Sequence, residues 1–356
     1  MSRFWSDIVH QLTPYTPGEQ PKIDNLVKLN TNENPYGPSP KVIEAIAAAN
    51  HDGLRKYPDP NAGELKQTIA NHFGLSVDSV FVGNSSDEVL AHVFRGLLKQ
   101  DRPLLFPDIT YSFYPVYCAL FDIAYQQVAL RDDFSLNIDD YSADNGGIIF
   151  ANPNAPTGIA VPLADIKTLL ERHSSSVIVV DEAYVDFGGE SAVSLIVDYP
   201  NLVVTQTLSK SRGLAGLRVG FALANPELIE GLERIKNSFH PYTLDALALA
   251  GAQAAFLDVD YFEQSRQKVI DTRERTTVGL QKLGFTVLPS SANFVFAAHQ
   301  TSDAGALFMK LRERGIVVRY FDKERLSDFL RISIGTDTEM QQLLSVLADI
   351  LSEPAQ

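Results

Sequence analysis

Lys210 stands at a position where a lysine can do covalent chemistry. Residues 201–206 before it are apolar and rich in β-branched side chains, which predicts a buried strand, and a glycine-punctuated turn leads on to a second strand over 217–223. A lysine at the carboxyl end of a strand in an α/β sheet points into the crevice where such sheets bind ligands. Its amine can then form an imine with a carbonyl compound. A solvated surface lysine fits the same local sequence, because most lysines are exposed.

Groups that can hold a phosphate flank this lysine. The hydroxyls of Thr207 and Ser209 precede and adjoin it, and Arg218 follows Lys210 by eight residues. A guanidinium group suits bidentate contact with phosphate oxygens. The segment therefore combines a reactive amine with an anion cradle.

A second candidate cradle lies upstream. A predicted strand over 79–82 ends in the turn 83–88, and helical spacing follows over 89–98. Free amides at the start of a helix bind phosphate, which makes the amides of Ser86 and Asp87 candidates. Plain N-capping by Ser85 or Ser86 also explains the turn, and this segment alone favours that interpretation over a phosphate site.

The bulk composition favours an ordinary globular enzyme. The chain has 356 residues, which predicts two domains, and it contains 45% hydrophobic and 21% charged residues. A net charge of −14 argues against nucleic acid or an anionic membrane as a partner. Any anionic ligand must then be held by a few local cations.

The cysteines, histidines and apolar segments indicate the cellular compartment and whether a metal is bound. Cys118 is the one cysteine, which excludes an intrachain disulfide and fits a reducing compartment. The seven histidines show no metal-binding spacing, so we expect no metal. No signal-peptide stretch and no run of 18 apolar residues occurs, so we expect a cytoplasmic protein.

Strands and helices alternate through the first two thirds of the chain. This pattern predicts a mostly parallel, seven-stranded type of sheet covered by helices on both faces, with strands near 102–106, 147–151 and 177–184 and helices near 112–122, 162–173 and 191–197. After residue 284, short strands over 285–288, 292–297, 316–320 and 329–334, with helices near 302–314 and 337–352, predict a smaller α+β domain. Residues 1 to about 40 are rich in Pro, Asn and Gly, which predicts an extended arm with turns. We expect an N-terminal arm over 1–45 that packs with the small domain and a partner subunit, a large domain over 46–240, and a linking helix with the small domain over 241–356.

Polar residues at the predicted strand ends should meet at one edge of the sheet. They comprise a lysine, a carboxylate, an amide, two tyrosines and anion-binding groups: Lys210, Asp181, Asn154, Tyr111, Tyr184, Arg218 and Ser86. Carboxyl ends of parallel strands share one edge, so groups far apart in sequence converge there. This set matches what pyridoxal phosphate needs, namely an imine-forming amine, an acid for the ring nitrogen, a stacking ring and a phosphate cradle.

Five motifs carry a resemblance to a known family. They are Leu29-Asn-Thr-Asn-Glu-Asn-Pro-Tyr-Gly-Pro-Ser-Pro40, Arg55-Lys-Tyr-Pro-Asp59, Asn152-Pro-Asn-Ala-Pro-Thr-Gly158, Asp181-Glu-Ala-Tyr184 and Thr207-Leu-Ser-Lys-Ser-Arg-Gly-Leu-Ala-Gly-Leu-Arg218. Together they resemble the fold-type I pyridoxal-phosphate aminotransferases, and they look most like the histidinol-phosphate aminotransferases of histidine biosynthesis. The resemblance runs in order from about residue 3 to residue 351.

The resemblance implies a catalytic role for three residues. Lys210 would join the cofactor as an imine and later carry the proton between the substrate's Cα and the cofactor. Asp181 would pair with the pyridine nitrogen, and Tyr111 would stack on the ring. Asn154 and Tyr184 would hydrogen-bond the ring's 3′ oxygen.

The resemblance also implies two anion sites and a homodimer. The cofactor phosphate would be bound by two amides, two hydroxyls and a guanidinium, from Ser86, Asp87, Thr207, Ser209 and Arg218. Tyr57 would reach that phosphate from a partner subunit. Arg319, Arg331 and Tyr15, with Asn154, would bind a phosphorylated amine, and 2-oxoglutarate would accept the amino group to give glutamate.

Two departures from the family pattern and three alternatives accompany this interpretation. Ala155 replaces an asparagine that the family often has, and the turn 84–88 lacks the usual glycine. An aromatic amino-acid aminotransferase or a threonine-phosphate decarboxylase would keep the same lysine, aspartate and arginine. A non-catalytic regulator of this fold that binds pyridoxal phosphate is the third alternative, and the intact set of site residues speaks against it.

Overall fold

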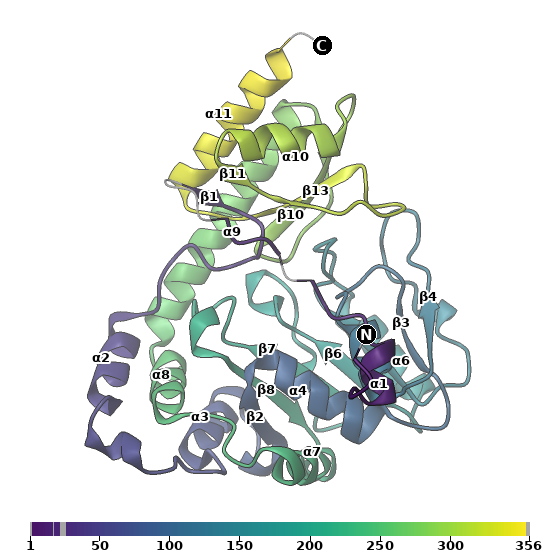
Figure 1. Cartoon of the computed structure of the whole chain (residues 1–356), viewed down its shortest axis with the longest axis vertical. Helices are drawn as coiled ribbons and strands as arrows, with labels where there is room; N and C mark the ends of the chain where they lie inside the picture. The colour runs from purple at the N-terminus through teal and green to yellow at the C-terminus, as the bar shows by residue number, and fades with distance from the viewer. Residues whose placement is uncertain (1, 17, 22–25, 354–356) are drawn as a thin grey trace.

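The computed structural model describes residues 2–16, 18–21 and 26–353. Two bodies are visible in Figure 1, a large one built on a wide sheet and a smaller one that carries the C-terminal helix. The long helix α9 (Val259–Lys282) runs from the large body into the small one. The predicted fold class, α/β with an added α+β unit, is confirmed.

The large sheet has seven strands in the order β2-β8-β7-β6-β5-β3-β4. Its strands are β2 (Val80–Asn84), β3 (Leu104–Pro107), β4 (Tyr125–Val128), β5 (Gly147–Ala151), β6 (Val177–Asp181), β7 (Leu202–Thr207) and β8 (Val219–Ala224). β8 pairs antiparallel with both β2 and β7, and the other pairs are parallel. The expectation of a mostly parallel sheet is therefore correct.

Alternate residues of each central strand enter two separate cores. On β6, Ile178 and Val180 pack in the core under α3, α6 and α8, whereas Val179 packs in the core under α4, α5 and α7. A strand buried on both faces reads as a continuous apolar run, which is why these strands were recognisable. The helices are α2 (Pro40–Ala49), α3 (Gly63–Phe73), α4 (Ser85–Val93), α5 (Tyr114–Phe121), α6 (Leu163–Arg172), α7 (Pro226–Phe239) and α8 (Ala246–Leu257).

The small body is built on an antiparallel sheet, β12-β13-β10-β9. Its elements are β9 (Phe285–Val287), β10 (Phe294–His299), α10 (Ala304–Glu313), β11 (Ile316–Val317), β12 (Arg319–Tyr320), β13 (Phe329–Ser333) and α11 (Asp337–Ser352). The N-terminal arm joins this body, since β1 (Val27–Lys28) pairs in parallel with β11. This pairing places the arm against the small body.

Local details differ from the sequence interpretation. The arm contains a short helix, α1 (Asp7–Gln11), where only extended chain and turns were expected. The exposed strand β4 was not predicted, and the predicted strand 316–320 is two short strands in different sheets. The predicted helix 191–197 is a single 3-10 turn over Ala192–Leu195.

Neither a membrane span nor a metal cluster is found in the described part of the chain. No helix there is long and apolar enough to cross a bilayer. Nor do three or more histidine, cysteine, aspartate or glutamate side chains gather there in a way that could hold a metal ion.

Candidate active site

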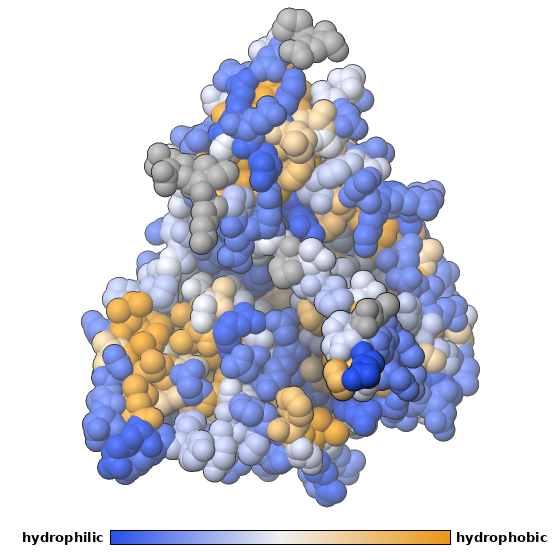
Figure 2. Space-filling model, in the orientation of Figure 1, coloured by the Kyte–Doolittle hydropathy of each residue, from blue (hydrophilic) through white to orange (hydrophobic). Residues whose placement is uncertain are grey.

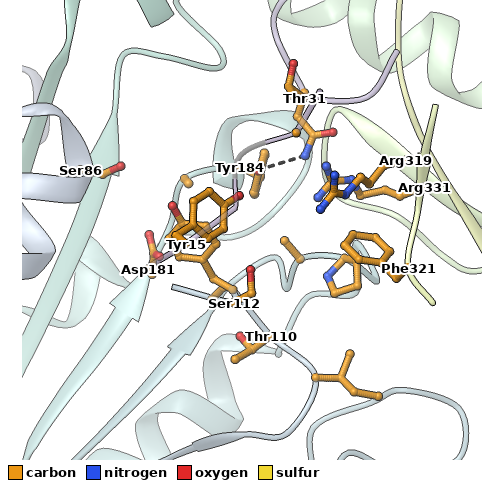
Figure 3. A pocket seen from close by; sticks show the side chains of 18 of the residues that line it. Tyr15, Thr31, Ser86, Thr110, Ser112, Asp181, Tyr184, Arg319, Phe321 and Arg331 are labelled. Carbon is orange, nitrogen blue, oxygen red and sulfur yellow. Dashed lines mark hydrogen bonds between the residues drawn. The ribbon is translucent and has the colours of Figure 1, made fainter. Parts of the chain in front are cut away.

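A cavity of about 780 Å³ lies between the carboxyl ends of the large-sheet strands and the small body. Twelve of the fourteen site residues expected from the sequence line it: Tyr15, Ser86, Asp87, Tyr111, Asp181, Tyr184, Thr207, Ser209, Lys210, Arg218, Arg319 and Arg331. Figure 3 shows Arg319 and Arg331 together on the side of the cavity opposite Ser86. Arg218 lies on the Ser86 side, where it pairs with Asp87, so the cavity has a cationic group at each end.

Lys210 lies three residues beyond the end of β7, within the cavity wall. Its Nζ donates a hydrogen bond of 3.1 Å to the backbone carbonyl of Thr31. Asn34 fixes the backbone at this point, because its Nδ2 donates to the Lys210 carbonyl at 2.9 Å. The arm thus holds the lysine amine through neutral groups and leaves it available to a carbonyl compound.

Asp181 ends β6 and is 4% exposed. Its carboxylate accepts hydrogen bonds from the Tyr114 hydroxyl at 2.9 Å and the Thr205 hydroxyl at 3.1 Å. Burial raises the pKa of Asp181 to about 6, and the charge of Asp87 adds to this rise. Within the described chain, no cation forms an ion pair with this carboxylate, so a positively charged ligand group would find a partner here.

The anion cradle at the other end begins with α4. Gly220 on β8 faces the start of this helix, where an added Cβ would collide with the Ser86 amide nitrogen. Glycine is therefore required for the helix N-terminus to lie this close to the sheet. Ser85 takes a left-handed backbone conformation at φ 71°, and its hydroxyl accepts from the Asp87 amide at 3.1 Å. Ser86 and Asp87 both line the cavity, so the start of this helix adjoins it, as a helix start that binds phosphate requires.

Asp87 also acts through its carboxylate. One oxygen pairs with Arg218 Nη2 at 2.8 Å, and the other accepts from the Tyr111 hydroxyl at 3.1 Å. Burial and the Asp87 charge raise the pKa of Tyr111 far above its ordinary value, so this phenol stays protonated. Asp87 therefore connects the guanidinium of the cradle with the ring that the sequence assigned to stacking.

Arg331 projects from β13 into the opposite end of the cavity. Its Nη2 donates to the Asn30 carbonyl at 2.9 Å, while its buried Nε has no hydrogen-bond partner among the described residues. The guanidinium carbons of Arg319 and Arg331 lie 5.2 and 5.5 Å from the ring centre of Phe321. Burial lowers the pKa of Arg331, with the Arg319 charge contributing. Two adjacent guanidinium groups with an unused donor are an arrangement that an anion would stabilise.

Comparison with known proteins identifies the family. The family described as Aminotransferase class I and II matches residues 24–347, which is most of the chain. The chain belongs to this aminotransferase family. Its relatives include Histidinol-phosphate aminotransferase 1 of Pseudomonas aeruginosa, 60% identical over 98% of this chain and 99% of the relative. The protein of the same name from Hydrogenovibrio crunogenus is 59% identical over 99% of both chains.

Solved structures agree with this assignment. The histidinol-phosphate aminotransferase of Sinorhizobium meliloti, solved in complex with pyridoxal-5′-phosphate, superposes with a TM-score of 0.89 at 25% identity, over 100% of this chain and 99% of that one. The class I and II aminotransferases depend on this cofactor.

The residues of this aminotransferase fit pyridoxal phosphate. A buried carboxylate without an ion-pair partner in the described chain, Asp181, suits a protonated ring nitrogen. The close approach at Gly220 places the start of α4 in the cavity wall, and Arg218, which pairs with Asp87, could bind a phosphate there together with the helix-start amides. Lys210 lies in the same cavity, as an imine-forming lysine must.

Two predicted site residues of the aminotransferase lie outside the cavity lining. Asn154 is buried behind it, where its Nδ2 donates to the Ile109 carbonyl at 3.0 Å and its Oδ1 has no partner in the described chain. Tyr57 is 81% exposed and stacks on Tyr242 at 4.6 Å between ring centres, away from the cavity of its own chain. In this single chain, neither residue touches the cavity to which the sequence assigned it.

Sequence reasoning also missed groups that support the site. Tyr114 and Thr205 hold Asp181, and Asn32 donates a hydrogen bond to the Tyr184 hydroxyl at 3.0 Å. Thr205 stands directly beside Asp181 in the register of β6 and β7, so a correct strand alignment would have located it. The contact of Asn32 joins residues 152 positions apart and has no local signal.

Proposed function

We propose that this protein moves an amino group from L-histidinol phosphate to 2-oxoglutarate, forming imidazole acetol phosphate and L-glutamate in histidine biosynthesis. The observation that carries the proposal is the Arg319–Arg331 pair, a second anion site in the cavity that contains Lys210. The substrate carries its amine on Cα and its phosphate on the neighbouring carbon, so the phosphate could lie at Arg319 and Arg331 while the amine faces the cofactor at Lys210. The family relatives, which bear the same activity in their names, support this choice.

Each site residue has a role in this proposal. Bound pyridoxal phosphate supplies an electron sink for the pair of electrons left when the substrate's Cα loses its proton. Lys210 takes that proton and later returns it, as a general base and acid within hydrogen-bond reach. Asp181 keeps the ring nitrogen protonated, Tyr111 covers the ring face, and Tyr184 donates to the ring oxygen. Asn154 contributes to the same ring contact once its amide turns toward the cavity.

Binding of the two phosphates is also divided between residues. The cofactor phosphate is held by groups at the helix start and after β7, namely Ser86, Asp87, Thr207, Ser209 and Arg218. The substrate phosphate, or the distal carboxylate of 2-oxoglutarate, is held by Arg319 and Arg331, with Tyr15 from the arm. Tyr15 already packs against Phe113 at 4.9 Å between ring centres, beside the cavity.

A half-reaction tests this function. Protein loaded with pyridoxal phosphate is mixed with L-histidinol phosphate, phenylalanine or threonine phosphate, and the loss of the absorbance of the lysine-bound cofactor is followed. Much faster conversion by histidinol phosphate supports the proposal. Equal conversion by phenylalanine assigns the protein to the aromatic aminotransferases, and release of carbon dioxide from threonine phosphate assigns it to the decarboxylases.

Two variants sharpen this test. Lys210→Ala should abolish the half-reaction while leaving the fold intact, whereas a regulatory protein would keep its function without the lysine. Arg331→Gln should weaken the reaction of histidinol phosphate far more than that of histidinol, because histidinol is the same amine without the phosphate. If Arg331→Gln slows both substrates equally, the second anion site is wrongly assigned.

We also propose a homodimer in which Tyr57 reaches the partner's cofactor phosphate. Figure 2 shows hydrophobic side chains gathered over α2 and α8, and these helices expose Ile43 and Leu257. Leu54, which follows α2, and Tyr242, which precedes α8, are exposed as well. An exposed apolar surface of this extent marks an interaction site. Such a dimer would bury the exposed Tyr57 and give it a role that its own chain does not provide.

Mixing two inactive variants tests the shared site. A dimer with Lys210→Ala in one subunit and Tyr57→Ala in the other would contain one complete site if Tyr57 acts across the interface. Tight cofactor binding should then reappear in half of the sites of mixed dimers. If mixing restores nothing, Tyr57 acts within its own subunit or not at all.

The remaining parts of the proposal concern domains and location. We divide the chain into an arm (1–45), a large cofactor-binding domain (46–240), and a linking helix with the small domain (241–356). We place the protein in the cytoplasm, in keeping with Cys118, which is buried and free. Limited proteolysis and cell fractionation test these two points.

A further inference from the structure

Asn32 occupies an unusual position in the arm. Its side chain and backbone are 1% exposed, and its backbone takes the left-handed conformation at φ 57°. Asparagine and glycine are the residues that adopt this conformation most readily. The residue lies between β13 of the small body and Tyr184, which follows the carboxyl end of the central strand β6.

A closed pair of hydrogen bonds fixes the orientation of the Asn32 amide. The Asn32 backbone N–H donates to Ser333 Oγ at 2.9 Å, so Ser333 acts as acceptor there. The Ser333 hydroxyl has one hydrogen, which it donates to Asn32 Oδ1 at 2.8 Å. The amide oxygen is therefore an acceptor already in use, and Nδ2 must face the other way.

Nδ2 faces the Tyr184 hydroxyl and donates to it at 3.0 Å, the bond drawn as a dashed line at Tyr184 in Figure 3. The Tyr184 oxygen is thus an acceptor for Asn32. The hydrogen of the Tyr184 hydroxyl is not used in this bond. It can point into the cavity, because Tyr184 lines the cavity. A phenol that accepts one hydrogen bond also donates a stronger one.

We propose that Asn32 is a positioning residue that aims the Tyr184 hydroxyl hydrogen into the cavity, at an anionic ring oxygen of the bound cofactor. This inference rests on the proposed function, which supplies that oxygen. Ser333 lies two residues after Arg331 on the same strand, so the network also connects the substrate's anion site to the cofactor ring.

The two polar atoms of the Asn32 amide have different partners, because Oδ1 accepts from Ser333 of the small body and Nδ2 donates to Tyr184. The Asn32 backbone also holds the arm to the small body, through its N–H to Ser333 and its carbonyl, which accepts from Asn293 Nδ2 at 3.0 Å. Nδ2 donates one hydrogen bond in the described chain, and Tyr184 receives it. The charged groups near the Tyr184 ring are Lys210, with its Nζ 5.7 Å from the ring centre, and Arg331. A purely structural asparagine would not require this directed bond.

The test is a pH titration of the absorbance that Lys210 gives when joined to pyridoxal phosphate. A hydrogen bond donated to the ring oxygen weakens its pull on the proton of the linking nitrogen, so loss of that bond should move the midpoint to higher pH. Tyr184→Phe should therefore raise the midpoint. Asn32→Gly, which keeps the left-handed backbone without strain, should raise it by a smaller amount, on the order of half to one pH unit.

The double variant separates positioning from general damage. If Asn32 acts through Tyr184, Asn32→Gly should add nothing in the Tyr184→Phe background. Asn32→Asp supplies a second measurement, because the carboxylate would accept the Tyr184 hydrogen instead of donating one. The midpoint shift caused by Asn32→Asp should be smaller in the Tyr184→Phe background, where only the aspartate charge acts. Asn145→Ala is the matched control, since this buried amide donates to the Ala143 carbonyl at 2.9 Å, does not line the cavity and should leave the midpoint unchanged.

Two results would overturn the inference. One is an unchanged midpoint in Asn32→Gly, and the other is an equal shift from Asn32→Gly with and without the Tyr184 hydroxyl. These failures differ from failure of the proposed function, in which the native protein would give no absorbance from a lysine-bound cofactor at all.

Discussion

Replacing Asp181 by Asn should change how the stability of the cofactor-free protein depends on pH. Burial raises the pKa of this carboxyl from an ordinary 3.8 to about 6. Because the folded state has the higher pKa, it binds the proton more tightly than the unfolded chain does. The resulting stability is fully present below the unfolded pKa and is lost as the pH rises through 6.

The size of the effect follows from the two pKa values. Between about pH 5 and pH 8, a single group with these values loses about 1.4 kcal/mol of unfolding free energy. The asparagine of the variant would not titrate, so the variant should lack this loss. Glu182, whose pKa burial raises to about 7, titrates in both proteins and cancels in the comparison. The slope with pH is the quantity to compare, because the asparagine also changes the bonds from Tyr114 and Thr205.

Urea unfolding of the cofactor-free proteins at several pH values measures this slope. Asp78→Asn, which removes an exposed carboxylate, serves as the control and should follow the native protein. Saturating pyridoxal phosphate should flatten the native curve, since a protonated ring nitrogen keeps Asp181 ionised. Parallel curves for the native protein and Asp181→Asn would show that the carboxylate is not held in a desolvated state, and the argument for its pairing with the ring nitrogen would fail.

Three further predictions concern the two anion sites. Arg331→Gln should raise the KM for histidinol phosphate by about 30- to 150-fold, the equivalent of about 2–3 kcal/mol for a charged hydrogen-bonded contact, as measured by steady-state kinetics; an unchanged KM would remove the residue from the site. Gly220→Ala should weaken binding of pyridoxal phosphate far more than binding of pyridoxal, because its Cβ would collide with the Ser86 amide; equal losses in a fluorescence titration would contradict this. Asp87→Asn should release Arg218 from its ion pair and weaken cofactor binding about tenfold, and tighter binding would mean that the carboxylate chiefly repels the phosphate.

Elements with strong local signals could be predicted from the sequence. β5 and α11 have the predicted bounds, the first because it is apolar throughout and the second because Thr336 and Glu339 form a capping box at its start. β4 could not be predicted, since three of its four residues are exposed and it depends on pairing with β3. The local sequence indicates which conformation a segment prefers, but an exposed edge strand such as β4 forms because of its hydrogen bonds to the neighbouring strand.

In the site, too, some residues could be assigned from local sequence and others depend on contacts that sequence does not indicate. Residues at strand ends, such as Asp181, were assigned to the cavity because parallel strands bring their ends together. Asn154 follows a strand too, but the turn after β5 directs its amide to the Ile109 carbonyl, and sequence carries no record of that direction. Asn32 could not be assigned, because its role depends on a left-handed backbone and on Ser333, which lies 301 positions away.

That separation of 301 positions also has a consequence for synthesis of the protein. The arm is made first, yet its partners β11 and Ser333 are made almost last. At ribosomal rates of roughly 5–20 residues per second, the arm waits about 15 to 60 s before it can pair. The last strand of the large sheet, β8, is synthesised before β11 and β13. The large sheet can therefore be complete while the arm, with the Thr31 carbonyl that accepts from Lys210, still lacks its pairing partners. A chain that stops short of β13 should therefore contain every catalytic side chain of the large sheet and still lack an assembled site.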